Sequence, residues 1–343
     1  MRKFFTAALA AIIFVTSANT VTVMAGPWPQ PVVAAAAIEF DDEVIVDGLT
    51  YALLENGTAA ITGKEESSEI TDLVIPETIE VDGAVYTVIY VSNAAFRDSE
   101  LTSVVLAETI VSIGNNAFRN NLITELVIPA SVTEMGNNAF RENLIVELVI
   151  PETVIYLGSD VFRANRLISV TIPDTIEFFY DGLFRANMLT SVAIPGSVTF
   201  IDDDAFMDNH ITSLFIPSSV EIIERIAFRN NHLTSIVIPD SVQEIGERTL
   251  DGNRLKVIWT DIGNGAALAE MLDTYVMGAQ TTNAVLLIEV AEIESPDILF
   301  DYHWEFYESI KNILDKLTIG QLFRWDNSAA EPAWLEIEDI GFN

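Results

Sequence analysis

A step of 22 residues organises most of this chain. Phenylalanine recurs at this step, and leucine takes the last place of its column: Phe96, Phe118, Phe140, Phe162, Phe184, Phe206, Phe228 and Leu250. Two more columns keep the same register: Pro129, Pro151, Pro173, Pro195, Pro217 and Pro239, and Asn121, Asn143, Asn165, Asn187, Asn209, Asn231 and Asn253. Periods of about 20–50 residues are typical of stacked repeats, so the chain is predicted to fold as a solenoid.

One repeat reads A-F-R-x-N-x-L-T-S-V-x-I-P-x-S-V-x-x-I-G-x-x. Leu233, Ile236 and Ile238 follow the L-x-x-L-x-L rhythm, in which a short strand lines one side of each coil. Pro239 cannot donate to a sheet ladder and therefore ends this strand. We expect a parallel sheet on one side of the solenoid. We also expect a turn of positive φ on the return path, at Gly114, Gly136, Gly158 and Gly246.

Stacking buries the apolar side that a single coil leaves exposed. The phenylalanine column is then predicted to form a continuous aromatic spine inside the solenoid. The asparagine column is predicted to be a buried ladder, whose side-chain amides satisfy backbone groups of turns in neighbouring coils. A catalytic role for so many asparagines in one row is not expected.

The phrase L-T-S-V-x-I-P-x-S-V-x-x-I-G-x-x-A-F-R-x-N resembles the BspA-type leucine-rich repeats of bacterial surface and secreted proteins, over about 70–262. The stretch V-D-G-L-T-Y-A-L-L-E-N-G-T-A-A-I-T-G before it resembles the entry cap of that family. The resemblance implies an α+β solenoid of 22-residue coils and a recognition role such as adhesion. The ligand would be a protein or a glycan.

Four segments are expected. Residues 1–25 resemble a secretory signal peptide, with Arg2 and Lys3 before the apolar run Phe4 to Val15, although an uncleaved membrane anchor is the alternative. Residues 26–69 are predicted to be a linker and a β-hairpin cap, 70–262 the solenoid, and 263–343 a partly helical cap or a small module. Dipeptides typical of hairpin turns are Asp47-Gly48, Asn56-Gly57 and Asp82-Gly83.

The two ends of the solenoid depart from the repeat. The first coil has nine extra residues after Pro76, which we interpret as a hairpin over the open end. At the other end, helices are predicted at Ala266 to Ala279 and Pro296 to Leu317, whereas Ala284 to Ile293 is ambiguous.

Composition excludes several functions. Acidic residues number 51 and basic residues 17, and a net charge of −34 argues against binding nucleic acid or an anionic membrane. The absence of cysteine excludes disulfides and thiolate metal sites. No nucleophile, zinc-protease, phosphate-loop or dinucleotide motif occurs, so neither catalysis nor a cofactor is expected. An enzyme that uses residues 263–343 is a weak alternative, and a structural surface-layer or matrix component is another.

The predicted strands have two outward columns. One holds serines and acids, with Ser191, Ser213 and Ser235 as candidate contacts. The other is apolar: Val105, Val127, Val149, Thr171, Ala193, Phe215, Val237 and Trp259. It is interpreted as a binding strip in which Thr171 and Val237 contribute and Phe215 and Trp259 are aromatic anchors. The alternative is that β-branched side chains stack along the sheet without binding anything.

Arginines form another column: Arg97, Arg119, Arg141, Arg163, Arg185 and Arg229. Stacked like charges repel unless acids lie between them, so we expect either a salt-bridge ladder or a basic stripe for an anionic ligand. His210 and His232 share a column, but a zinc site normally needs three or four protein ligands. No metal site is expected, and the acidic run Ile201 to Asn209 lacks the EF-hand spacing. The chain is expected to be secreted or held at the cell surface.

Overall fold

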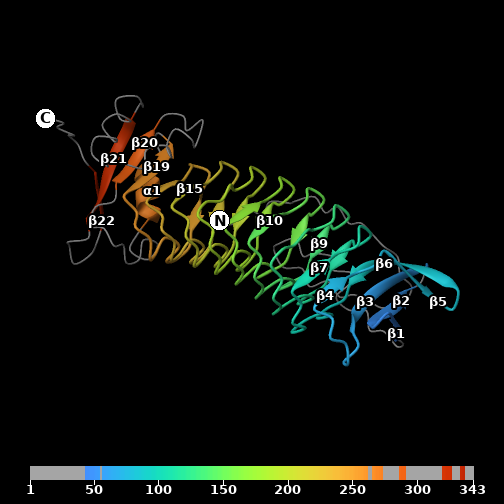
Figure 1. Ribbon diagram of the computed structural model, residues 1–343. Coiled ribbons are helices and arrows are strands. Elements are labelled where there is room, and N and C mark those ends of the chain that lie inside the picture. Colours follow the sequence, from blue (N-terminus) through green and yellow to red (C-terminus); the bar gives the residue numbers. More distant parts are fainter. Residues whose placement is uncertain are drawn as a thin grey trace. The chain divides into compact units, whose positions relative to one another are not determined.

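Most coils contribute two short strands, which pair in parallel with the same strands of a neighbouring coil (Figure 1). The computed structural model describes residues 43–54, 56–261, 265–272, 286–290, 319–326 and 333–336. All of these lie in one compact unit, Val33–Asn343. The predicted signal peptide and linker up to residue 42 lie outside the described residues. The repeats form a β-solenoid of about eight turns.

The first ladder, here called the pre-proline ladder, contains the strand predicted from the leucine rhythm. Its strands are β4 (Asp72–Val74), β7 (Ser103–Val105), β10 (Glu147–Val149), β12 (Ser169–Thr171), β15 (Ser213–Phe215), β17 (Ser235–Val237) and β19 (Val257–Asp261). Three groups of these strands pair in parallel, β4 with β7, β10 with β12, and β15 with β17 and β19. Between β10 and β12 the register moves by one repeat, as in the pair Leu148 and Val170. Proline follows β4, β10, β12, β15 and β17 as predicted, whereas Ala107 takes its place after β7 and Asp261 takes it within β19. The proline carbonyl accepts a turn hydrogen bond, such as Val154 N–H to Pro151 O at 3.1 Å.

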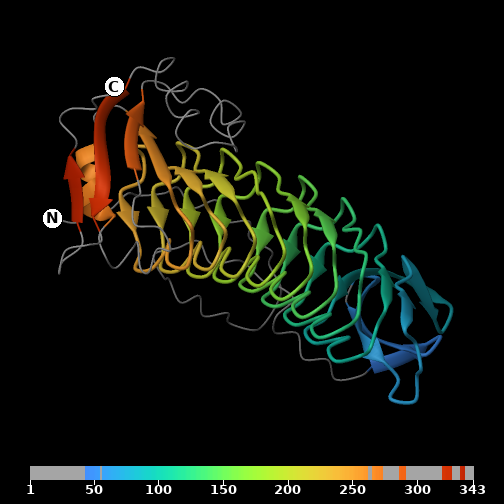
Figure 2. The ribbon, with the colours of Figure 1, turned by 60° about the vertical axis from the view of Figure 1, so that its left-hand side comes forward.

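The second ladder, here called the return ladder, corrects the expectation of a sheet on only one side. Its strands are β6 (Ala84–Val91), β8 (Ser112–Ile113), β9 (Glu134–Met135), β11 (Tyr156–Leu157), β13 (Phe178–Phe179), β14 (Phe200–Ile201), β16 (Ile222–Ile223) and β18 (Glu244–Ile245). After β6 these strands have two residues each, too few for an alternating pattern in the sequence. Figure 2 shows both ladders on the stacked coils.

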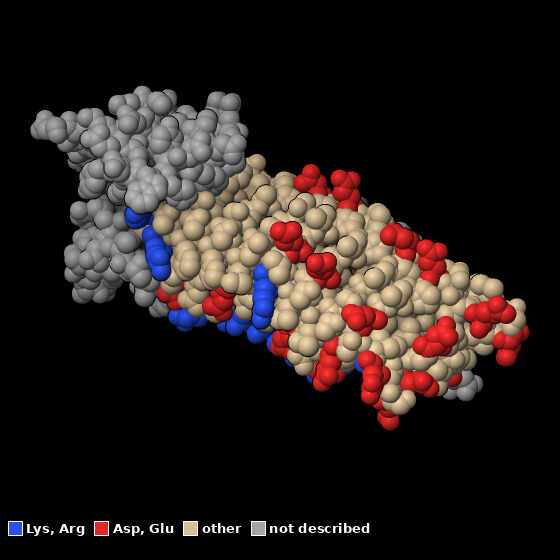
Figure 3. Space-filling view, viewed as in Figure 1, with Lys and Arg blue, Asp and Glu red and all other residues tan. Residues whose placement is uncertain are grey.

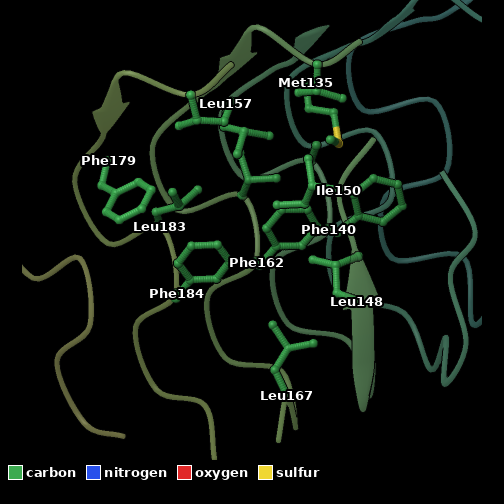
Figure 4. Close-up of a cluster of buried hydrophobic side chains, with 14 of the residues drawn as sticks. Met135, Phe140, Leu148, Ile150, Leu157, Phe162, Leu167, Phe179, Leu183 and Phe184 are labelled. Carbon is green, nitrogen blue, oxygen red and sulfur yellow. The ribbon is translucent and has the colours of Figure 1, made fainter. Parts of the chain in front are cut away.

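The core between the ladders is the predicted aromatic spine. Phe96 to Phe228 form an unbroken stack, with ring centroids 5.1–6.1 Å apart and interplanar angles of at most 25°. Figure 4 shows Phe140, Phe162 and Phe184 among aliphatic side chains from both ladders. These rings are fully buried, so each coil gains its apolar contacts from its neighbours.

The asparagine column is the predicted buried ladder. In each coil the side-chain oxygen accepts a hydrogen bond from a backbone N–H of the preceding coil, as Asn143 does from Ile123 at 3.2 Å. The side-chain nitrogen donates to the phenylalanine carbonyls of the preceding and the same coil, here Phe118 at 2.9 Å and Phe140 at 3.1 Å. The amides therefore satisfy buried backbone groups where the chain turns.

The glycine column has a different role from the predicted one. None of its four members has a positive φ, and a Cβ at Gly136 would lie 2.7 Å from the backbone nitrogen of Asn115. Glycine is needed there because two coils approach closely. The left-handed residues lie at two other positions of the coil, for example Asn138 with φ 59° and Glu142 with φ 60°.

Three hairpin turns lie at the predicted dipeptides near the N-terminal end. β1 (Glu43–Val46), β2 (Leu49–Leu54) and β3 (Thr58–Lys64) form an antiparallel sheet, and β5 (Thr78–Val81) pairs antiparallel with β6. Both residues of Asp82-Gly83 have positive φ, 53° and 80°. The extra residues of the first coil thus form the predicted hairpin, and β3 joins the return ladder by parallel pairing with β6.

The C-terminal part differs from the partly helical cap that was predicted. The described residues contain one short helix, α1 (Gly265–Met271), which overlaps the start of the first predicted helix, Ala266 to Ala279. Three strands follow: β20 (Leu286–Val290), β21 (Ile319–Asp326) and β22 (Ala333–Glu336). β20 pairs in parallel with β19, so the pre-proline ladder continues beyond the last repeat. The second predicted helix, Pro296 to Leu317, lies outside the described residues.

Candidate recognition surface

The outward face of the pre-proline ladder carries an exposed apolar row. Its members, here called the valine column, are Val74, Val105, Val127 and Val149, with exposed fractions of 62%, 57%, 79% and 65%. Strand pairing aligns Val74 with Val105 directly. β-branched side chains favour the extended backbone, and alternation directs these four away from the core. The row presents contiguous apolar surface to solvent.

Two of the expected contact residues, the anchor Trp259 and its neighbour Val237, are not on this exposed surface. Trp259 is 2% exposed and Val237 is 1% exposed, although they share the register of Phe215, which is half-buried. The indole Nε1 of Trp259 has no hydrogen-bond partner among the described residues. The repeat determines the direction of a side chain from the ladder, but not whether other residues cover it. The open part of the apolar column is therefore at the N-terminal coils.

The exposure of the polar candidates also falls towards the C-terminal end of the ladder. Thr171 and Ser191 are exposed, whereas Ser213 and Ser235 are half-buried and directly paired across β15 and β17. Thr171 lies in register with Val149 and continues the valine column. The structure thus brings Thr171 and the valine column together, and places the two paired serines farther along the ladder.

Acidic side chains flank the valine column on both sides. Exposed acids precede it by two residues, at Asp72, Glu125 and Glu147, and follow it by three, at Glu77, Glu108 and Glu152. Hydrogen bonds from Ser103 and Thr102 lower the pKa of Asp72, so its carboxylate is charged at neutral pH. The face shown in Figure 3 is mostly uncharged with scattered acids, and basic residues gather along its lower edge. This surface suits an apolar ligand with positive charge.

The arginine column is paired with acids along its length. Arg141 Nη1 lies 3.2 Å from Asp160 Oδ2, and its Nε lies 3.1 Å from Glu142 Oε1. Further pairs are Arg97–Asp98, Arg119–Glu142, Arg163–Asp160, Arg185–Asp204 and Arg229–Asp251. The arginines thus form a salt-bridge ladder with interleaved acids, which the sequence offered as one of two interpretations.

Near residue 200 the acids outnumber their arginine partners. Burial, and then the charges of Asp160 and Asp204, raise the pKa of Asp181 to about 6. Burial also raises the pKa of Asp202. Even so, the described part of the chain contains no group of three acidic, histidine or cysteine side chains that could hold a metal ion.

The two histidines of one column lie face to face. The rings of His210 and His232 are 5.1 Å apart at an angle of 2°. Burial, and then the neighbouring Arg254, lower the pKa of His232, which favours neutral imidazole.

A cleft that the sequence did not indicate lies where β4 meets the N-terminal hairpins. Its volume is about 430 Å³. Its apolar lining comprises Val46, Leu49, Tyr51, Ile70, Leu73, Val74, Pro76 and Ile79, and its polar lining Asp47, Asp72, Thr78 and Glu80. Segments around residues 46–51 and 70–80 form it together, so no single stretch of sequence predicts it. Val74 belongs to both this cleft and the valine column.

Comparisons with known proteins agree on the repeat. The family model described as "BspA type Leucine rich repeat region (6 copies)" matches residues 66–189 and 199–261, more than half of the chain. A search of curated proteins found no match. Among the residues that the structure describes, no helix is long and apolar enough to cross a membrane.

Several solved structures are similar. A leucine-rich repeat protein from Bacteroides ovatus has 24% identity and a TM-score of 0.52, covering 64% of this chain and 65% of that one. This chain thus spans slightly less than two thirds of that relative, and the likeness concerns the fold. A leucine-rich cell surface protein from Faecalibacterium prausnitzii has 21% identity and a TM-score of 0.44, covering 64% and 76%. The pneumococcal vaccine antigen PcpA has 15% identity and a TM-score of 0.44, covering 66% and 84%.

Proposed function

Because the chain belongs to the BspA-type leucine-rich repeat family, we propose that it is an exported recognition protein that binds a protein or a glycan. The observation that carries the proposal is the valine column, an exposed apolar row with acidic borders. Contiguous exposed apolar surface is a feature of interaction sites. Burying one valine side chain contributes about 1.5 kcal/mol, so four neighbouring valines supply a useful part of a binding free energy.

Thr171, and at its margin Phe215, extend the proposed site along the ladder. Trp259 and Val237 would contribute by supporting the ladder from a covered position. Ser191, Ser213 and Ser235 offer hydroxyl groups beside the column for polar contacts to the ligand. The repeated spacing allows an extended ligand to contact several equivalent positions.

Export is supported by the sequence of residues 1–25. Arg2 and Lys3 precede an apolar run, and Val23-Met24-Ala25 fits a small-residue cleavage site. A secreted or surface-retained protein is proposed on this basis. Mass spectrometry of protein recovered outside the cells should find a chain that begins near Gly26. Recovery of only uncleaved chain from the cell interior would contradict export.

The binding test is a screen of the protein against extracellular-matrix proteins and glycans. The test variant replaces Val105, Val127 and Val149 with serine. The control replaces Val111 and Ile155 with serine, because these residues are also exposed and apolar but border the return ladder. A ligand lost by the test variant and kept by the control supports the proposed surface.

Other outcomes count against that surface. A ligand that binds both variants equally, but is lost when Arg119 and Arg141 become glutamine, would place the site on the arginine column. The absence of any ligand at high micromolar concentration would contradict recognition and favour a matrix role.

A further inference from the structure

The pre-proline ladder has an open edge at its first strand. Among the residues that the structure describes, β4 pairs with β7 and with no other strand. Backbone groups alternate in direction along a strand. Thr71 O accepts from Thr102 N–H, and Ile75 N–H donates to Val105 O, so both of these groups face β7. The N–H and C=O groups of Asp72 and Val74 therefore point away from β7, towards the N-terminal end of the ladder. Such an edge is a template for another strand.

The cleft lies along this edge. Asp72, Leu73 and Val74 all line it, and the β1–β2 hairpin and the start of β5 form its other sides. Its floor is apolar, since Leu49, Tyr51 and Ile79 are buried. A volume of about 430 Å³ is within the size range of ligand pockets. An added strand could bond to the backbone groups of Asp72 and Val74 and place one inward side chain in the cleft.

The charge around the cleft is strongly negative. Asp47, Asp72 and Glu80 line it together with no Lys or Arg. Residues 43–54 and 56–96 contain nine acidic side chains, whereas Lys64 is their one amine. The Lys64 amine donates to the carbonyls of Ile70 and Ser99, at 2.9 and 3.1 Å, rather than to a carboxylate. A positively charged occupant is favoured, and a second copy of this acidic chain is disfavoured.

We propose that the cleft binds an extended, basic segment of a partner protein, which adds to the open edge of β4 as a further parallel strand. Its central apolar side chain lies next to Leu73 and enters the cleft. The residue before it is Lys or Arg and lies beside Asp72. The residue after it is apolar and continues the valine column next to Val74. The segment thus takes the place of a missing coil, with the order basic–apolar–apolar.

The pairing also assigns individual backbone bonds. In a parallel ladder with the register of β4 and β7, the N–H of the central residue donates to Asp72 O. Its C=O accepts from Val74 N–H. The N–H of the following residue points away from β4. This inference specifies the partner class of the proposed recognition function and rests on that function.

The experiment measures fluorescence polarisation of a labelled heptapeptide, Thr-Thr-Lys-Val-Val-Thr-Thr, with the full chain. N-methylation of the first valine removes the bond to Asp72 O and is expected to weaken binding about fivefold or more. N-methylation of the second valine is the matched control and should change binding by less than about twofold, because its N–H faces away. Glu in place of Lys should weaken binding at least about tenfold.

A protein variant tests the charge separately. Asp72→Asn keeps an oxygen that accepts from Ser103 and Thr102, so the fold is expected to persist. It should weaken the lysine peptide about threefold or more and leave a Thr-Thr-Thr-Val-Val-Thr-Thr peptide unchanged. Asp174→Asn, which removes an exposed acid elsewhere, is the control.

The outcomes separate this inference from the proposed function. Equal effects of the two N-methyl positions, or no polarisation change at millimolar peptide, would overturn strand addition. The ligand screen with the valine-column variant can still succeed in that case, because it does not depend on β4 pairing. If a screened ligand binds the valine column but the peptide does not bind, only the proposal of strand addition at the cleft is rejected.

Discussion

The side-chain oxygen of Asn165 accepts a hydrogen bond from the backbone N–H of Ile145, 20 residues earlier, at 3.1 Å. Its side-chain nitrogen donates to Phe140 O at 3.0 Å and to Phe162 O at 3.1 Å. One amide thus connects three backbone groups of two coils at a position that is 7% exposed. The same pattern recurs through the asparagine column, so coil stacking depends on a polar ladder as well as on the aromatic spine.

Asn165→Ala is expected to lower the free energy of unfolding by about 3 kcal/mol or more. Truncation leaves one N–H and two carbonyls without this partner, and each buried unsatisfied group costs about 1–3 kcal/mol. Water that enters the site and bonds to these groups offsets part of this cost. Urea denaturation followed by circular dichroism measures the change. Because repeat proteins can unfold in parts, the m-value should be compared with that of the parent chain.

Ser99 is the control for this substitution, because it occupies the same column in the first coil. Its hydroxyl makes a local bond to Arg97 O at 3.3 Å. Ser99→Ala should change stability by less than about 0.5 kcal/mol. A similar loss for both substitutions would show that the amide ladder adds nothing specific.

Phe162→Ala should destabilise the chain by about 3–5 kcal/mol, because it removes a fully buried ring from the middle of the stack. Its neighbours Phe140 and Phe184 lie 6.1 and 5.9 Å away. Phe162→Leu should cost clearly less, since Leu250 already occupies the last place of the column at 1% exposure. Thermal unfolding of both variants checks the order. Equal losses would mean that ring stacking, rather than filled volume, determines the stability of the spine.

The sequence predicted those features that depend on a residue type with a distinct structural role. The spine and the asparagine ladder followed from residue types that recur at one step, and the hairpin turns followed from dipeptides that tolerate positive φ. The return ladder did not, because strands such as Tyr156–Leu157 are too short to show a period. Gly136 was assigned to a turn of positive φ, whereas it permits close backbone contact.

The candidate site was predicted less completely, because exposure depends on the whole fold. Periodicity directed Trp259 outward but gave no information on what covers it. The sequence did not indicate which of its many acids would pair with the arginines, so the role of Asp160 became clear only from the fold. The cleft was missed because Tyr51 and Leu73 come together only when β2 and β4 are placed in space.

The pair Arg141–Asp160 is expected to contribute about 1 kcal/mol of coupling in a double-mutant cycle with Arg141→Gln and Asp160→Asn. Both side chains are less than a fifth exposed, at 19% and 18%, so water screens them only partly. The control cycle uses Arg225 and Asp203, whose side chains are 59% and 30% exposed. Its coupling should be near zero at moderate salt. Equal coupling in the two cycles would contradict the role assigned to burial.

Asp181→Asn should stabilise the chain at pH 7 and have little effect near pH 3.5. The pKa of Asp181 is raised in the folded state from 3.8 to about 6 by burial and neighbouring acids. The folded chain therefore keeps this proton over a pH range in which the unfolded chain has lost it, and stability falls as the pH rises through that range. The expected gain at pH 7 is about 1 kcal/mol, because the carboxyl is partly exposed and solvent screens the repulsion.

Urea unfolding of the parent and Asp181→Asn chains at several pH values between about 3.5 and 7 measures this effect. Asp174→Asn is the control, because it removes one acid that lies outside the cluster of Asp160, Asp181 and Asp204 and so reports the general effect of lower net charge. The difference between the Asp181→Asn and Asp174→Asn curves should grow as the pH approaches 7. A difference that stays constant with pH, or one that grows towards acid, would show that Asp181 does not carry repulsion in the folded chain.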